Sequence, residues 1–365
     1  MSTTAYRFGV APHILQIDPY KPGKPEDELI RELGLPKVFK MASNENCLGP
    51  SPLAVEAMKQ AAEKTHRYPD GAGYYLRQAL SQKLKFPLSQ IIPGNGSTDL
   101  VEVIARTYLQ PGDNSVTADQ TFVMYRIATL GVNAKCIAVP VRNFSYDLDG
   151  MLRAINERTR IIYIANPNNP TGTMIPRREF EAFLREVPPD VLVVHDEAYC
   201  EYVERDDYPN GLDYLERHPN LIVLRTFSKI HGLAGILIGY GVSCEEIVLN
   251  LNRLRSPFNT SSVAQAAAMA ALNDAGHVRR SREHNRSERK FLETELLARN
   301  IPYVPSVTNF VLLNVPDCMR VYDALLHHGV IVRPMKSFNN QEGIRVTVGR
   351  HEENVTFLSA LEKVL

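Results

Sequence analysis

Cysteine is scarce in this sequence, and the cysteines that it has are scattered. They stand singly at Cys47, Cys136, Cys200, Cys244 and Cys318, with no CxxC pair and no Cys/His cluster at the spacing of metal ligands. An odd, dispersed set is unlike the disulfide framework of a small secreted protein. We therefore expect a reducing, cytoplasmic location and no metal site.

An excess of charge and a long hydrophobic run are missing as well. Lys and Arg number 41, and so do Asp and Glu, which leaves no net field to attract nucleic acid or an acidic membrane surface. No stretch approaches a membrane span, and the polar, proline-containing start lacks the apolar run of a signal peptide. We expect a soluble protein whose partners are small molecules, with no nucleic acid and no membrane.

The sequence does contain an alternation of short apolar runs with amphipathic stretches. Strands are predicted at residues 161–165, 191–194, 221–224 and 236–240, and helices at residues 52–64, 97–109 and 176–186. This pattern is typical of βαβ units on a mostly parallel sheet. At 365 residues the chain is also longer than a domain with a single hydrophobic core usually is. We expect an α/β fold whose large domain has a mostly parallel sheet flanked by helices.

The composition and the residue pattern of the sequence change after Arg255. An alanine-rich helix is predicted at residues 263–272 and a long charged one at residues 277–300, followed by short strands and helices to the end. These pieces predict a smaller α+β domain. The expected division is an N-terminal arm at residues 1–40, a large domain at residues 41–255 and the small domain at residues 256–365.

A candidate anion site lies in the motif GNGSTD at residues 94–99, which runs directly into a predicted helix. Its glycines let the backbone approach a ligand, and the helix N-terminus offers free N–H groups, so the motif can cradle a phosphate. An ordinary helix cap has the same letters, and for the motif alone that alternative stays open.

Two further residues follow predicted strands, at the edge where open parallel sheets bind ligands. Lys229 comes shortly after the strand at residues 221–224 and can act as a nucleophile once it is desolvated, although a lone lysine can equally be solvated. Asp196 ends the run VLVVHD and would need a cationic partner, such as the pyridinium nitrogen of pyridoxal phosphate (PLP). By two-residue alternation, His195 should point away and pack in the core.

Four motifs together resemble the fold type I PLP aminotransferases in order and spacing. They are NPNNPTG at residues 166–172, DEAY at residues 196–199, SK at residues 228–229 and GLAGILIGY at residues 232–240. PYKPGKP at residues 19–25, SNENCLGPSP at residues 43–52, RYPDGAGYYLRQAL at residues 67–80 and IRVTVGR at residues 344–350 are similar to the histidinol-phosphate aminotransferase branch. The resemblance implies PLP as cofactor, an amino donor with 2-oxoglutarate as substrates, and a homodimer.

The resemblance also implies residue roles. Lys229 would hold PLP as a Schiff base and move the substrate proton, and Asp196 would keep the pyridine nitrogen protonated. Tyr199 and Asn169 would bind the phenolic oxygen of PLP, and Phe122 would stack on its ring. Lys229, Asp196 and Tyr199 form the implied catalytic set. The implied phosphate ligands are Gly96, Ser97, Thr98, Thr226, Ser228, and Tyr68 from a second subunit.

For the substrate, Arg333 and Arg345 fall on strand-like runs of the expected small domain. Their planar forks suit a carboxylate or a phosphate. The resemblance implies that Arg345 grips the acidic end of the substrate together with Tyr20, and it adds Asn46 to the substrate-binding set.

The same arginines serve several reactions, so alternatives stay open. The branch implies transfer from histidinol phosphate to 2-oxoglutarate, giving imidazole acetol phosphate and glutamate in histidine biosynthesis. An aromatic amino acid aminotransferase fits the same residues. A PLP-dependent decarboxylase or lyase of the threonine-phosphate type, and a PLP-fold protein that binds without turnover, remain further hypotheses.

Two positions depart from the family pattern. Cys47 stands where relatives usually have proline, a change that a turn can tolerate. Leu237 stands eight residues after Lys229, where the pattern places an arginine on the cofactor phosphate. Because an aliphatic side chain cannot neutralise a phosphate, either this charge is missing or another cation, such as Arg225 or His231, supplies it.

Overall fold

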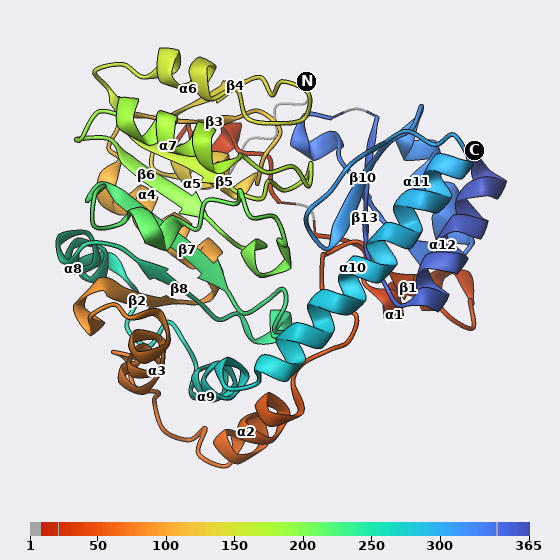
Figure 1. The fold of residues 1–365 in the computed structure, drawn as a ribbon, viewed down its shortest axis with the longest axis horizontal. Coiled ribbons are helices and arrows are strands. Elements are labelled where there is room, and N and C mark those ends of the chain that lie inside the picture. Colours follow the sequence, from red (N-terminus) through yellow and green to blue (C-terminus); the bar gives the residue numbers. More distant parts are fainter. Residues whose placement is uncertain (1–8, 21, 341) are drawn as a thin grey trace.

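The computed structural model describes residues 9–20, 22–340 and 342–365, and its larger part is built on a seven-stranded sheet (Figure 1). The strands lie in the order β2-β8-β7-β6-β5-β3-β4. Their bounds are β2 Ile91–Gly94, β3 Asn114–Ala118, β4 Lys135–Val139, β5 Thr159–Ala165, β6 Leu192–Asp196, β7 Leu221–Thr226 and β8 Gly239–Val242. β8 runs antiparallel to β2 and β7, whereas the other pairs are parallel. The mostly parallel sheet predicted from the sequence is confirmed.

Helices cover both faces of this sheet because successive strand residues point to opposite sides. On β5, Ile161 and Tyr163 face a core shared with α4 (Gly96–Tyr108), α5 (Met124–Gly131) and α8 (Glu245–Leu254). Ile162 and Ile164 face the other core, with α2 (Pro52–Ala62), α3 (Tyr74–Leu84), α6 (Leu148–Ala154), α7 (Arg177–Glu186) and α9 (Ser262–Leu272). No helix in the described ranges is long and apolar enough to cross a membrane.

The smaller part is built on a four-stranded antiparallel sheet in the order β12-β13-β10-β9. Its strands are β9 Tyr303–Val304, β10 Phe310–Asn314, β12 Arg333–Pro334 and β13 Gly343–Thr347. Buried residues of α10 (Ala275–Ala298), α11 (Cys318–His327) and α12 (His351–Val364) share its core. Figure 1 shows the long α10 crossing the molecule beside β10 and β13. This arrangement is the α+β unit that the sequence predicts.

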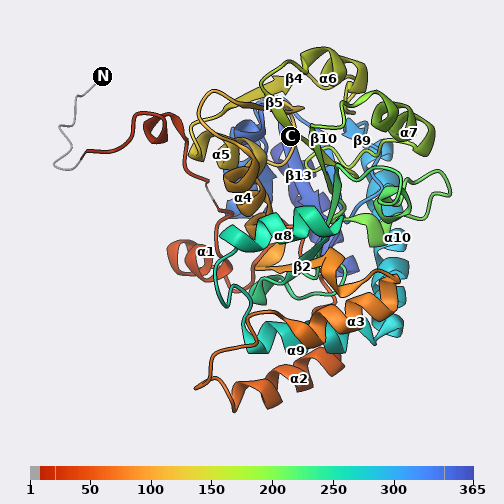
Figure 2. The same ribbon diagram turned by 90° about the vertical axis from the view of Figure 1, so that its left-hand side faces the viewer.

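The division of the chain at residue 255 stays a prediction, and the packing of α9 suggests a different one. Ala264, Ala267 and Ala268 of α9 belong to the core of the large sheet, and α9 lies beside α2 and α3 (Figure 2). At the other end, α1 (Glu26–Leu33) packs through Leu29 on β11 (Val330–Ile331), with which β1 (Phe39–Lys40) pairs. We propose that the larger part extends through α9, and that the smaller part includes α1 and β1.

One predicted strand is shorter in the structure. Ala234–Ile236 forms a 3-10 turn, and Leu237 has a left-handed backbone with φ of 50°. Extended pairing therefore begins only at Gly239, so the strand prediction was wrong for residues 236–238. This turn carries Leu237 toward the edge of the sheet where the ligand-binding loops meet.

Candidate active site

A pocket of about 520 Å³ lies where the two parts of the molecule meet. This volume suits a small-molecule ligand. The structure brings nearly all of the sequence-predicted site residues to its lining: Tyr20, Gly96, Ser97, Thr98, Phe122, Asn169, Asp196, Tyr199, Thr226, Ser228, Lys229, Arg333 and Arg345. These residues come from segments that are far apart in the sequence, so the fold itself assembles the site.

The strand register explains why these residues meet. Gly94 at the end of β2 and Thr226 at the end of β7 both pair with Gly239 of β8. Ala165 at the end of β5 pairs with Asp196 at the end of β6. The carboxyl ends of these parallel strands therefore share one edge, where open α/β sheets bind ligands.

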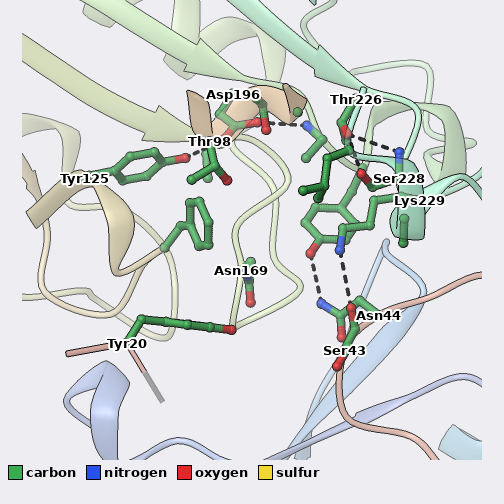
Figure 3. A pocket seen from close by; sticks show the side chains of 18 of the residues that line it. Tyr20, Ser43, Asn44, Thr98, Tyr125, Asn169, Asp196, Thr226, Ser228 and Lys229 are labelled. Carbon is green, nitrogen blue, oxygen red and sulfur yellow. Dashed lines mark hydrogen bonds between the residues drawn. The ribbon is translucent and has the colours of Figure 1, made fainter. Parts of the chain in front are cut away.

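The start of α4 forms an anion cradle at this edge. Gly96 has φ of 79°, and a Cβ at Gly239 would lie 2.9 Å from the backbone nitrogen of Ser97. Glycine thus lets β8 approach the helix start, whose first N–H groups have no intrahelical partner. The Thr226 hydroxyl donates to Ser228 Oγ at 3.0 Å beside the cradle (Figure 3). Every one of these donors is uncharged.

Asp196 is buried among neutral hydrogen-bond donors. Its Oδ2 accepts a bond from the Tyr125 hydroxyl at 2.9 Å, and its Oδ1 accepts one from the Ala198 backbone at 3.1 Å. Burial raises the pKa of this carboxyl to about 6, while the two hydrogen bonds and the charge of Lys229 oppose that rise. A cationic ligand group would stabilise the carboxylate here.

His195 lies on the reverse side of β6, as the alternation predicts. It is buried against the ring of Phe180, with centroids 4.4 Å apart, and burial lowers its pKa to about 4. At neutral pH it is an uncharged core residue. The prediction of a packed histidine is confirmed.

The amine of Lys229 lies between the loop at Ser43 and the ring of Tyr199. Its Nζ donates to the Ser43 carbonyl at 3.3 Å and lies 5.7 Å from the centroid of the Tyr199 ring. The Tyr199 hydroxyl accepts a 2.9 Å bond from Asn44 Nδ2 (Figure 3). The amine thus lines the pocket with few contacts of its own. A ligand bound in the pocket could react with it.

Two arginines face each other across the strands of the smaller part. Arg333 of β12 and Arg345 of β13 are register partners, and both line the pocket. Arg345 is buried and donates to the Ala42 carbonyl at 2.7 Å and to Asn169 Oδ1. Burial lowers the pKa of Arg345 to about 10, which still leaves it charged at neutral pH. The Arg333 guanidinium lies 5.4 Å from the ring centroid of Tyr20. This side of the pocket can receive an anion.

Two predicted site residues lie outside the described lining. Tyr68 is 84% exposed and stacks on Phe258, with ring centroids 4.8 Å apart. Asn46 Nδ2 donates to the Ile230 carbonyl at 2.8 Å and to Ser281 Oγ at 2.9 Å. Asn46 thus supports the turn that follows Lys229. Cofactor contact by Tyr68 and substrate contact by Asn46 remain predictions.

Several lining residues are not among those that the sequence indicates, and Ser43, Asn44 and Tyr125 make contacts at the site. Ser43 and Asn44 belong to the motif SNENCLGPSP. Tyr125 comes three residues after Phe122, about one helical turn away, and its ring meets that of Phe122 edge-on at 5.5 Å. Phe122 precedes α5, which begins at Met124, so the short separation from Phe122 is the local signal that favours Tyr125.

Comparisons with known proteins agree with this geometry. Residues 36–361 match the family model described as aminotransferase class I and II. The chain is 47% identical to the histidinol-phosphate aminotransferase of Moorella thermoacetica, over 96% of this chain and 92% of that protein. It is 49% identical to histidinol-phosphate aminotransferase 1 of Nitrosococcus oceani, over 96% and 95% of the two chains.

Solved structures are similar along the whole chain. The histidinol-phosphate aminotransferase of Sinorhizobium meliloti, in complex with pyridoxal-5'-phosphate, has a TM-score of 0.89 at 30% identity and covers 100% of this chain and 99% of its own. The aspartate aminotransferase of Thermus thermophilus with maleate has a TM-score of 0.84 at 22% identity, over 98% of this chain and 100% of its own, a likeness that shows the fold alone. With a family model along most of its length and relatives nearly half identical over almost all of both chains, this protein belongs to the aminotransferase class I and II family.

Proposed function

We propose that this protein is a PLP-dependent aminotransferase that transfers the amino group of histidinol phosphate to 2-oxoglutarate in histidine biosynthesis. The products would be imidazole acetol phosphate and glutamate. The observation that carries the proposal is one pocket that combines Lys229, a buried Asp196 and the paired Arg333 and Arg345. The near-half identity to enzymes named for this reaction supports the choice of donor.

The lining residues fit the groups of PLP. The N–H groups at the start of α4 and the hydroxyls of Thr226 and Ser228 suit a phosphate, and Asp196 has a raised pKa among neutral donors, which suits a pyridinium nitrogen. Phe122 can cover a ring face, while Tyr199 and Asn169 can donate to its phenolic oxygen. When bound, PLP supplies an aldehyde and an electron-withdrawing ring.

The chain's own side chains would then hold and move the proton. Lys229 Nζ would be the nucleophile toward the aldehyde, and its amine would take the proton from Cα of the amino donor. Asp196 contributes most when negative charge develops in the transition state, because its carboxylate stabilises the protonated ring nitrogen. Tyr125 keeps this carboxylate in place through its 2.9 Å hydrogen bond.

The arginine pair would receive the acidic groups of both substrates in turn. Arg345 donates to neutral acceptors, and its Nε is buried without a hydrogen-bond partner among the described residues. An arriving phosphate or carboxylate would supply the missing negative charge. Tyr20, beside Arg333, would close the pocket from the N-terminal arm.

We also propose that two copies form a homodimer in the cytoplasm. Residues 9–19 lead outward past α5 (Figure 2), and Val10, Ile14 and Leu15 are exposed. Tyr68 is exposed as well, and a second copy could bring it to a phosphate site. All five cysteines are free thiols, in keeping with a reducing compartment.

The proposed reaction is tested with purified protein, histidinol phosphate and 2-oxoglutarate. We expect glutamate and imidazole acetol phosphate in equal amounts, with phenylalanine a poorer donor. Faster glutamate formation from phenylalanine would indicate an aromatic aminotransferase. Release of CO2 or phosphate would indicate a decarboxylase or lyase, and no product from any donor would contradict the proposal.

A further inference from the structure

Leu237 is exposed beside the anion cradle. It lines the pocket and follows the Ala234–Ile236 turn. The carbonyl oxygen of its neighbour Ile238 lies 3.4 Å from Thr226 Oγ1. Leu237 is 52% exposed and has φ of 50°, a backbone conformation that bulky side chains rarely adopt. Core packing therefore does not account for a leucine at this position.

The lining at this end of the pocket is acidic. Asp99 and Glu102 of α4 both line it, next to Ser97 and Thr98. In the described part of the chain, the lysines and arginines of the lining are Lys229, Arg333 and Arg345. The two arginines belong to the smaller part, and Lys229 is the residue that we assign to the aldehyde. The cradle itself thus combines neutral donors with negative side chains.

Among the residues that the structure describes, Asp99 is paired with neutral donors rather than with a cation. Its Oδ2 accepts bonds from the Asn95 backbone at 2.9 Å and from Asn259 Nδ2 at 2.7 Å. Arg255 lies behind that amide and donates to Asn259 Oδ1 at 2.6 Å and to the Gly71 carbonyl at 2.9 Å. Asn259 therefore stands between the arginine and the carboxylate.

The two cations that the sequence offers as substitutes are engaged elsewhere. Arg225 donates from Nε and Nη2 to Glu197 Oε2 at 2.8 and 2.7 Å, and from Nη2 to Asn210 at 2.7 Å. It precedes Thr226 on β7, so its side chain points to the opposite face of the sheet. His231 is buried, which lowers its pKa to about 3 and keeps it neutral.

We infer, on the basis of the proposed function, that this chain binds the PLP phosphate through neutral donors alone, and that Leu237 makes the cofactor readily exchangeable. A cation beside a phosphate forms a charge-assisted pair that strengthens binding about tenfold to hundredfold. Without that pair, the phosphate group contributes less to the affinity of the protein for PLP. Loading with PLP would then depend on its free concentration.

The test compares PLP with pyridoxal, which lacks the phosphate. Cofactor-free protein is titrated with each compound and followed by absorbance, for the wild type, Leu237→Arg and the uncharged, long Leu237→Met. We expect Leu237→Arg to tighten PLP at least tenfold and to leave pyridoxal within about twofold. Leu237→Met should match the wild type. Inorganic phosphate alone should raise the melting temperature of cofactor-free Leu237→Arg more than that of the wild type.

A second variant, at an exposed position of α4, tests the inference independently. Glu102→Gln removes a like charge and should tighten PLP by about twofold to fivefold, again without effect on pyridoxal. An unchanged ratio of PLP to pyridoxal affinity in Leu237→Arg would overturn the inference, because the phosphate charge would already be balanced, for instance by a partner subunit. A wild-type protein that binds neither compound would instead overturn the proposed function, and the inference with it.

Discussion

The phenolic hydroxyl of Tyr125 donates a 2.9 Å hydrogen bond to Oδ2 of Asp196, and both side chains are buried. The Tyr125 ring stacks on Tyr163, with centroids 4.9 Å apart and planes 4° from parallel. Helix α5 and strand β5 therefore fix the hydroxyl against the carboxylate. Because this bond favours the ionised form of Asp196, Tyr125 is a positioning residue for the group that we assign to the ring nitrogen.

Tyr125→Phe should raise the pKa of Asp196 above its value of about 6 in the cofactor-free protein. The variant lacks the hydrogen bond from Tyr125, which lowers this pKa, whereas burial still raises it. Less carboxylate would be present at pH 6 to 7, so the acid-side midpoint of PLP binding should move up by about one pH unit. The measurement is PLP affinity between pH 5 and 8. Tyr163→Phe, which removes the hydroxyl of the stacked neighbour, is the matched control. Identical midpoints in all three proteins would show that the bond does not tune Asp196.

Asp196→Asn should change how the stability of the cofactor-free protein depends on pH. The folded pKa of Asp196, about 6, lies above its ordinary value of 3.8. Stability from the protonated carboxyl is thus fully present below about pH 4 and is lost as pH rises through 6. Relative to the variant, the wild type should lose at most about 3 kcal/mol between pH 4 and pH 7.

Urea unfolding of both proteins at several pH values measures this difference. Burial lowers the pKa values of His195 and His231 to about 4 and about 3, so acidification destabilises both proteins through these histidines. The difference between the two curves isolates Asp196. Curves that run parallel from pH 4 to pH 7 would contradict a raised pKa for this carboxyl.

Arg345→Ala should raise the KM for both histidinol phosphate and 2-oxoglutarate by about tenfold to hundredfold, because each loses a charge-assisted partner. PLP affinity should change less than the KM values, because Arg345 reaches the cofactor site through Asn169, to which it donates a hydrogen bond. Steady-state kinetics and PLP titration measure the two effects. Arg320→Ala, at a partly exposed arginine of α11, is the control. Unchanged KM values for both substrates would place anion recognition elsewhere.

A homodimer should be visible by light scattering at micromolar concentration. Removal of residues 1–18, which include the exposed Ile14 and Leu15, should weaken association if the arm packs on a second copy. Tyr68→Phe should keep the dimer and reduce PLP affinity by a few-fold if its hydroxyl reaches a partner's phosphate site. A fully active monomer would contradict both assignments.

Much of the fold could be predicted because its signals are local. The apolar run at residues 161–165 predicted β5, since a fully buried strand needs apolar side chains on both faces. Asp196, Thr226 and Lys229 could be expected in one pocket, because parallel strands end at a common edge.

Contacts between distant segments could not be read in the same way. Asn46 binds Ile230 and Ser281, which lie far along the chain, and no local pattern encodes that pairing. The engagement of Arg225 with Glu197 depends on which strands are neighbours. An alanine-rich helix such as α9 can pack on either sheet of this protein, so its sequence alone does not predict its packing against α2.

The site of covalent attachment is the most direct measurement. The protein is loaded with PLP, treated with borohydride, digested, and analysed by mass spectrometry. We expect the reduced cofactor on the peptide that contains Lys229, and we expect Lys229→Ala to show neither the label nor turnover, because it lacks both nucleophile and base. Label on another lysine of the wild type, or turnover retained in Lys229→Ala, would contradict the assignment of this pocket as the active site.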